Sequence, residues 1–172
     1  QRQMCIRDRN RAEREGGRFK GTEEERISLL KGVMGAADAV DVELFTALED
    51  TGIVEKAAEL GITTIISFHD FMGTPSRDEI LSTINKMHAL GDVAKVAVTP
   101  NSLEDALTLL EVTLSLRGGK PVVAISMGAL GKHTRIIAPL YGSALTYGSV
   151  GESVAPGQLS VWELRRILDV LT

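Results

Sequence analysis

A lysine stands inside an otherwise apolar segment of this sequence. Lys95 lies in VAKVAVTP (93–100), a run typical of a buried β-strand. Desolvation disfavours the charged form of a lysine and lowers its pKa toward neutrality. A neutral lysine amine is a nucleophile that forms a Schiff base with a ketone or an aldehyde. The segment therefore predicts either a reactive lysine or a lysine whose stem is buried while its ammonium reaches water.

The neighbours of Lys95 along its own strand are small. The period of two places Lys95, Ala97 and Thr99 on one face and Val96 and Val98 on the other. We therefore expect room for a substrate beside the lysine.

A histidine ends another apolar segment, ITTIISFHD (62–70). A lone histidine such as His69 is commonly a core residue with satisfied hydrogen bonds. Adjacent parallel strands lie roughly 5 Å apart, so residues near their ends can reach one substrate. An imidazole at this place suits general acid or base chemistry near neutral pH. The presence of Lys95 favours this second interpretation.

Three more polar residues lie outside the predicted strands. Glu15 stands in a flexible REGGRF loop, where its carboxylate either orients His69 or is simply solvated. Arg135 opens a predicted helix, where its guanidinium suits a bound carboxylate or lies on the surface. Gln158 follows a Pro-Gly turn that presents its amide.

Strand and helix patterns alternate from residue 22 onward. Strands are predicted at 39–46, 62–70, 93–100, 121–128 and 143–150, and helices at 22–36, 50–60, 77–90, 103–117, 133–141 and 161–171. Four predicted helix starts carry a capping-box pattern, in which a Ser or Thr precedes an acidic residue by three positions: Thr22, Ser76, Ser102 and Ser160. The alternation indicates a parallel sheet covered by helices.

Two parallel architectures fit this alternation, a doubly wound sheet and a (β/α)8 TIM barrel. No G-x-G-x-x-G follows a predicted strand, and no Walker A lysine motif is present. Polar residues fall at the C-terminal ends of the strands, where a barrel builds its active site. We therefore expect a barrel in which these strand ends form a single pocket.

The composition of the 172 residues, 44% hydrophobic and 24% charged, is that of a globular protein. A net charge of -4 and 4% aromatic residues give little support for nucleic-acid binding. No apolar run is long enough for a membrane span and no signal-peptide pattern is found, so we expect a cytoplasmic protein. A single cysteine excludes an intramolecular disulfide, and no residues have metal-ligand spacing, so no metal is predicted.

Residues 1–9, QRQMCIRDR, differ sharply in composition from the rest of the chain. They resemble translated sequencing-adapter DNA, which encodes Met-Cys-Ile-Arg-Asp-Arg in one frame. We expect this segment to be non-native and residues 10–172 to form the domain. The alternative is a native charged N-terminal arm.

Several motifs, taken in order, resemble type I 3-dehydroquinate dehydratase. They are REGG (14–17), DVELF (41–45), SFHDF (67–71), KVAVTP (95–100), SMG (126–128), TR (134–135), SALTYGSV (143–150) and APGQLS (155–160). The resemblance implies a (β/α)8 lyase of the shikimate pathway that removes water from 3-dehydroquinate without a metal or cofactor. Such enzymes are often homodimers.

The resemblance also implies roles for individual residues. Lys95 matches the Schiff-base lysine, His69 the residue that takes the C2 proton and later donates to the departing hydroxyl, and Glu15 its acidic helper. Four others match residues that bind or surround the substrate: Arg11, Met127, Arg135 and Gln158. Of these, Arg135 is expected on the substrate carboxylate.

Two departures from the family pattern stand out. Val154 replaces a serine that often precedes APGQ, and nearby Ser153 is the candidate to substitute for it. We expect the family's first two strands, and most or all of the third, to be missing before the REGG loop. We expect an incomplete barrel with exposed sheet edges that is inactive and poorly stable. Another class I Schiff-base lyase or aldolase, and an inactive barrel with a binding or structural role, stay open as alternatives.

Overall fold

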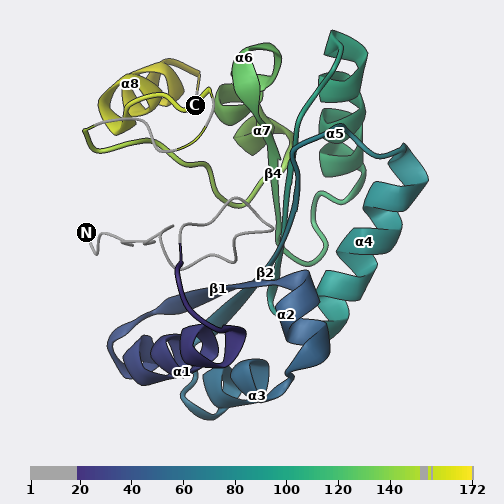
Figure 1. Ribbon diagram of the computed structural model, residues 1–172. Helices are drawn as coiled ribbons and strands as arrows, with labels where there is room; N and C mark the ends of the chain where they lie inside the picture. Colours follow the sequence, from purple (N-terminus) through teal and green to yellow (C-terminus); the bar gives the residue numbers. More distant parts are fainter. Residues whose placement is uncertain (1–18, 152–154, 156, 172) are drawn as a thin grey trace.

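Four parallel strands form the sheet of the computed structural model, which describes residues 19–151, 155 and 157–171 (Figure 1). They are β1 (Ala39–Glu43), β2 (Thr63–Asp70), β3 (Val93–Val98) and β4 (Val122–Ser126). Each strand pairs with the next along the chain, in the order β1-β2-β3-β4. A doubly wound sheet would reverse its strand order at a switch point, whereas a barrel wall keeps this sequential order.

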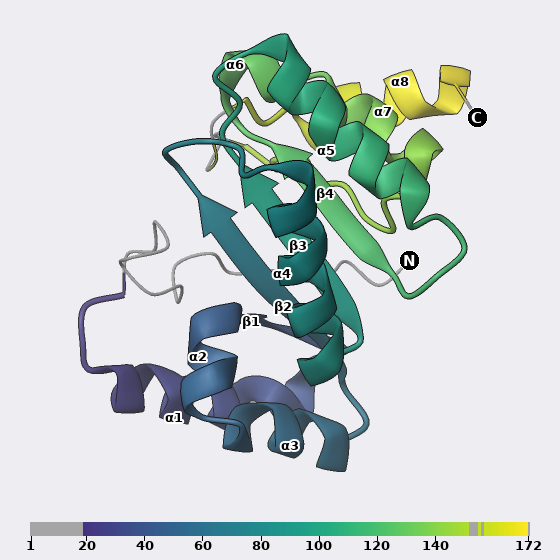
Figure 2. The same ribbon diagram turned by 90° about the vertical axis from the view of Figure 1, so that its right-hand side faces the viewer.

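Helices connect the strands and cover one face of the sheet. They are α1 (Glu23–Val33), α2 (Leu44–Glu49), α3 (Gly52–Glu59), α4 (Arg77–Leu90), α5 (Leu103–Ser115), α6 (Gly128–Gly131), α7 (Thr134–Tyr141) and α8 (Val161–Leu171), with a 3-10 turn (Met34–Ala36) after α1. Helices α4 and α5 run along the outer face of the strands (Figure 2). None of the helices in the described part of the chain is long and apolar enough to cross a membrane.

Side-chain hydrogen bonds hold the predicted helix starts. Thr22, Ser76 and Ser102 form capping boxes at the N-termini of α1, α4 and α5. Ser160 and Glu163 exchange the same pair of hydrogen bonds at the start of α8. Each box satisfies amide groups that have no partner in the first helical turn. The four predicted caps are confirmed.

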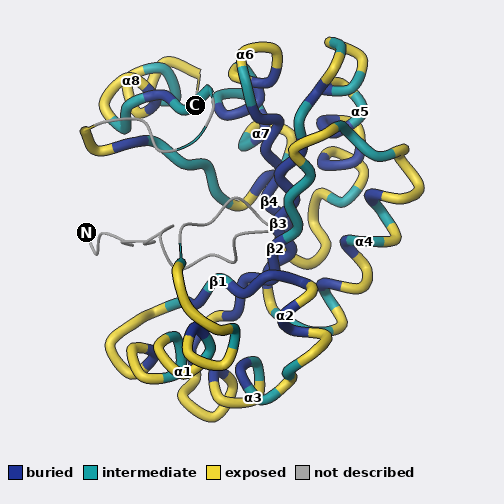
Figure 3. Tube along the Cα trace, in the orientation of Figure 1, coloured by how far each residue is buried: buried dark blue, intermediate teal, exposed yellow. Residues whose placement is uncertain are grey.

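Most residues of the strands are buried (Figure 3), and their side chains belong to two apolar clusters, one on each face of the sheet. Residues such as Val42, Ile66 and Val96 point outward and pack with the helices. The alternate residues, among them Val93 and Val123, form a second, inner apolar cluster. This inner face is the one that a closed barrel would enclose.

A charged network ties the first two helices to β1. Arg26 of α1 is 2% exposed, and its guanidinium lies 2.9 Å from Oε2 of Glu43, a carboxylate that is 3% exposed. The same guanidinium donates to Glu23 and to Oγ1 of Thr46 in α2. The strand predicted at 39–46 therefore ends at Glu43, because the residues after it turn into α2 and bury Thr46 against this cluster.

The strand predicted at 143–150 is wrong in extent. The segment forms two isolated parallel bridges and no strand: Ser143 pairs with Val122 of β4, and Ser149 pairs with Ser160. The amide of Ala144 donates to the carbonyl of Val122 at 2.7 Å, but the next strand amide, that of Ala124, donates to Oγ of Ser143 at 3.1 Å. A serine hydroxyl thus takes the place of a backbone acceptor, and the ladder goes no further.

Candidate active site

Lys95 lies in the middle of β3 with its side chain on the inner face of the sheet. It is in register with Ser67 of β2 and Val123 of β4. The residue is 4% exposed, so the alternative in which its ammonium reaches water is wrong. Instead, Nζ donates a hydrogen bond of 2.6 Å to Oδ2 of Asp41 in β1. Nζ also lies over the ring of Tyr147, 5.1 Å from the ring centroid.

His69 lies on the strand next to Lys95, as predicted. It is in register with Ala97, two residues beyond Lys95 toward the C-terminal end of β3. Alternation along both strands therefore places His69 and Lys95 on the same inner face. The imidazole is half-buried and stacks on Phe71 with a centroid distance of 6.2 Å. A histidine at the open end of this face is placed for proton transfer near the lysine.

Asp41 is a charged residue of this face whose contact with Lys95 was not predicted from the sequence. Burial acts to raise the pKa of Asp41, but the charge and hydrogen bond of Lys95 hold it below its usual value. Ser67 and the charge of His69 also lower the pKa of Asp41. The hydroxyl of Ser67 lies near Asp41 without making a hydrogen bond of standard geometry. One signal was present in the sequence: Asp41 and Glu43 alternate with valines in a buried strand, which puts two carboxylates on one face.

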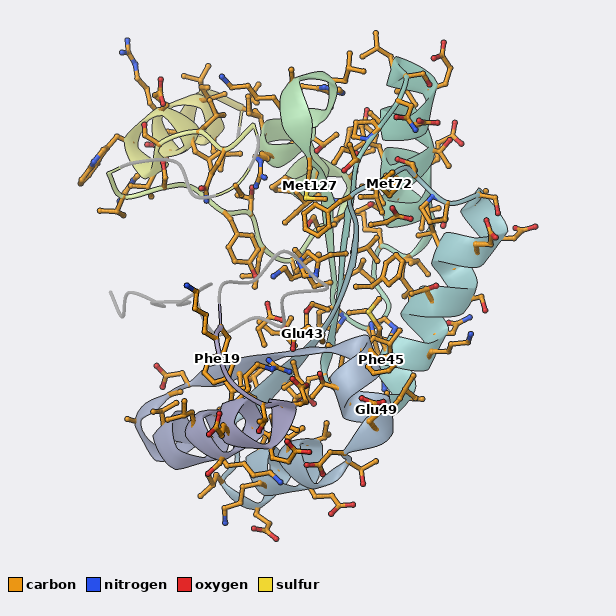
Figure 4. The ribbon with its side chains drawn as sticks, in the orientation of Figure 1. Phe19, Glu43, Phe45, Glu49, Met72 and Met127 are labelled. Carbon is orange, nitrogen blue, oxygen red and sulfur yellow. The ribbon has the colours of Figure 1, made fainter. Side chains whose placement is uncertain are left out.

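Met127 and Arg135 follow β4. Met127 is 5% exposed, belongs to the inner apolar cluster and lies beside the C-terminal end of β4 (Figure 4). Its amide donates to the carbonyl of Val98 at 2.7 Å. Arg135 in α7 is 3% exposed, so its interpretation as a surface arginine is wrong. Burial lowers the pKa of the Arg135 guanidinium.

Gln158 is placed by a close contact of the glycine before it. Gly157 has φ +69°, which an L-residue rarely adopts, and a Cβ there would collide with the carbonyl oxygen of Gly128. The amide of Gln158 donates to the carbonyl of Ala155 at 3.1 Å. The turn that carries Gln158 therefore packs on the residue that directly follows Met127.

The other predicted site residues lie outside the described residues. They are Glu15, Arg11 and Ser153. Val154 and the segment 1–9 lie there too. Their roles, and the non-native origin of residues 1–9, stay predictions.

A shallow hollow of about 430 Å³ lies at the opposite end of the strands. It is lined by Thr63 and Thr64 at the start of β2, by Asp92 before β3 and by residues of α3 and α4. Because its lining does not include Lys95 or His69, it is not the predicted pocket. Among the described residues, no three His, Cys, Asp or Glu side chains are grouped in a way that could hold a metal ion.

The sequence profile of type I 3-dehydroquinase matches residues 8–172. The chain belongs to the type I 3-dehydroquinase family. It is 52% identical to the 3-dehydroquinate dehydratase of Methanococcoides burtonii over an alignment of 170 residues that covers 97% of this chain and 71% of that protein. It is 48% identical to the enzyme of the same name from Methanosarcina acetivorans, covering 94% of this chain and 70% of that one.

Solved structures of 3-dehydroquinate dehydratases have the same fold over the part that they share with this chain. The 3-dehydroquinate dehydratase of Geobacillus kaustophilus superposes with a TM-score of 0.88 at 35% identity, over 94% of this chain and 65% of that chain. The Clostridium difficile enzyme with covalently modified comenic acid gives 0.85 at 34% identity, over 94% and 66%. The chain thus spans about two thirds of the length of these solved relatives. The predicted barrel family is confirmed.

Proposed function

We propose that Lys95 of this 3-dehydroquinase forms a Schiff base with the C3 ketone of 3-dehydroquinate and eliminates water to give 3-dehydroshikimate. The observation that carries the proposal is the position of Nζ. It lies buried on the inner face of the sheet, one strand away from His69. A buried amine beside a titratable imidazole is the pair of groups that imine formation and proton transfer require.

Each step of the proposed reaction balances. The neutral amine of Lys95 attacks C3, the carbonyl oxygen takes up one amine proton and one proton from the solvent and leaves as water, and an iminium is formed. His69 removes a proton from C2, and the electron pair passes into the iminium. The hydroxyl at C1 then departs with a proton from His69, as a second water. Hydrolysis of the conjugated iminium takes up one water and releases 3-dehydroshikimate, the neutral amine of Lys95 and a proton.

The remaining predicted residues bind and orient in this proposal. The guanidinium of Arg135 pairs with the substrate carboxylate, since a planar fork of donors matches two carboxylate oxygens. Gln158, Arg11 and Ser153 donate to the ring hydroxyls, and Met127 lines the pocket beside the imine. Glu15 orients His69. We propose neither metal nor cofactor, and we propose a cytoplasmic homodimer.

Borohydride trapping tests the proposal. The chain is incubated with 3-dehydroquinate and sodium borohydride, and peptide mass spectrometry locates the added mass. We expect a reduced adduct on Lys95 and none on exposed lysines such as Lys86 and Lys120. The variant Lys95→Met should give no adduct. The variant His69→Ala should still give the adduct but form little product, because imine formation precedes the proton transfer.

A second chain separates two reasons for failure. It carries, at its N-terminus, the part of the Methanococcoides burtonii relative that the match leaves uncovered. An adduct on the extended chain alone would mean that the lysine needs the rest of the barrel. Absence of an adduct on both would refute the dehydratase proposal. Trapping with a phosphorylated sugar, and not with 3-dehydroquinate, would instead support the alternative of a class I aldolase.

A further inference from the structure

We propose that Asp41 and Tyr147 form a cation-binding cage around Nζ of Lys95 and hold this nitrogen as a cation, first as the free ammonium and later as the iminium. Neither residue is among those that the sequence analysis assigned. The part of the inference that concerns the iminium rests on the proposed function, whereas the part that concerns the ammonium does not.

The carboxylate side of the cage comes from β1. Asp41 lies two strands away from Lys95, and the lysine side chain crosses the inner face of β2 to reach it. The Nζ–Oδ2 distance is 2.6 Å, and the two side chains are 5% and 15% exposed. A charge-assisted hydrogen bond this short, away from water, favours the cationic nitrogen and the ionised carboxylate together.

The aromatic side of the cage comes from the segment after α7. Tyr147 packs against the inner apolar cluster and presents its ring at 5.1 Å from Nζ. The face of an aromatic ring carries partial negative charge and attracts a cation within about 6 Å, most strongly when the cation is desolvated. Two groups from distant elements, both selective for positive charge, thus meet at one nitrogen.

The other titratable groups around this nitrogen do not replace the cage. His69 on β2 lies near Asp41 and helps to keep it ionised. Glu43 on β1 also lies on the inner face, but Arg26 holds it at 2.9 Å. On the side of β4, Val123 in register with Lys95 is apolar. Within the described residues, the charge on Nζ is therefore balanced chiefly by Asp41.

The cage has opposite effects on two steps of the proposed reaction. It disfavours loss of a proton from the ammonium, which must occur before the amine attacks the ketone. It favours the iminium, which carries its positive charge on the same nitrogen and accepts the electron pair from C2. Removing the cage should therefore make the free amine more reactive while slowing elimination. A merely structural disturbance would not move these two quantities in opposite directions.

Two measurements on the full 172-residue chain, and on its extended version, test the cage. The first is competitive acetylation of Lys95 with acetic anhydride as a function of pH, read by peptide mass spectrometry. In Asp41→Asn we expect half-maximal labelling to move by about one pH unit or more to lower pH, the size of effect that an adjacent opposite charge produces. The second is the rate at which the imine forms product, which we expect to fall about tenfold or more, since one pKa unit corresponds to a tenfold change.

Matched variants separate the cage from general packing. Tyr147→Leu removes the ring and should move both measurements in the direction of Asp41→Asn, by less. Glu43→Gln removes a buried carboxylate from the same strand and should leave the labelling of Lys95 unchanged. If circular dichroism shows that Asp41→Asn does not fold, Asp41→Glu and Tyr147→Leu decide. Asp41→Glu should retain the wild-type labelling midpoint.

The results distinguish failure of the cage from failure of the proposed function. An unchanged labelling midpoint in Asp41→Asn and Tyr147→Leu would overturn the cage, whatever the activity. If Asp41→Asn and Tyr147→Leu lowered both the reactivity of Lys95 toward labelling and the rate of product formation, that result would also overturn the cage. If the wild-type chains form no adduct with 3-dehydroquinate, the proposed function fails, but a shifted labelling midpoint would still support the ammonium cage.

Discussion

Removal of the Lys95 charge should destabilise the fold strongly at neutral pH and much less at acid pH. In Lys95→Met the carboxylate of Asp41, 15% exposed, loses the ammonium with which it pairs. At an effective dielectric constant of about 20, unit charges 2.6 Å apart attract by roughly 6 kcal/mol. Desolvation offsets part of this attraction. Breaking one side of a buried pair typically costs about 3–5 kcal/mol, which is the loss we expect at pH 7.

The sign of the pH dependence comes from Asp41. The pKa of Asp41 is lowered in the folded protein. In the wild type, the ionised carboxylate therefore contributes its full share of the stability above the unfolded pKa of about 3.9, and this share is lost as the pH falls through the lower pKa of the folded state. In Lys95→Met, burial is no longer countered by the ammonium, and the pKa of Asp41 rises. The variant therefore regains stability as the pH falls and the carboxyl becomes neutral, and its difference from the wild type shrinks.

Urea unfolding followed by far-ultraviolet circular dichroism, at pH 7 and pH 4.5, measures this difference. Lys56→Met is the matched control: Lys56 pairs with Glu59 at 2.9 Å, but the two side chains are 44% and 66% exposed. Such a surface pair contributes only about 0–1 kcal/mol. Equal destabilisation of Lys95→Met at both pH values, or a loss no larger than that of Lys56→Met, would refute the reasoning.

Two further substitutions test the elements that surround the site. Arg26→Met leaves Glu43 buried without its cation, and we expect the free energy of unfolding to fall by about 3–5 kcal/mol in urea denaturation; a loss under about 1 kcal/mol would contradict a buried pair. Gly157→Ala adds both backbone strain and a collision with Gly128, whereas Gly61→Ala, at φ +65° in open space, adds strain alone. We expect Gly61→Ala to lose about 1 kcal/mol of stability and Gly157→Ala to lose more. Only Gly157→Ala should trap less 3-dehydroquinate. Equal effects of the two substitutions would show that the contact with Gly128 is unimportant.

Local signals in the sequence were sufficient to predict where most of the helices lie. The helix predicted at 77–90 is α4 with the same bounds, because Ser76 and Glu79 form a capping box that needs only neighbouring residues. The apolar runs around Ile66 and Val96 likewise predicted β2 and β3. Helix α2 was missed, since its first residues read as the end of a strand and only the buried contact of Thr46 with Arg26 decides otherwise.

The extent of the last predicted strand also depended on tertiary contacts. The segment 143–150 has an alternating pattern, but a strand exists only where a neighbour supplies hydrogen bonds. In the described structure the side chain of Ser143 accepts a hydrogen bond from an amide of β4, and the pairing of this segment with β4 ends after one bridge. No periodicity in the sequence reports which partner an amide selects.

The choice of Lys95 as the candidate nucleophile and the face on which it lies came from the sequence alone, because strand alternation and burial of an apolar run are properties of consecutive residues. The same is true of the pairing of Lys95 with His69 on adjacent strands, which short β/α connections favour. The charge environment of Lys95 required the tertiary structure. Asp41 lies 54 residues away in the chain and 2.6 Å away in space. Electrostatic interactions depend on distance in space and on exclusion of water, and the fold alone decides both.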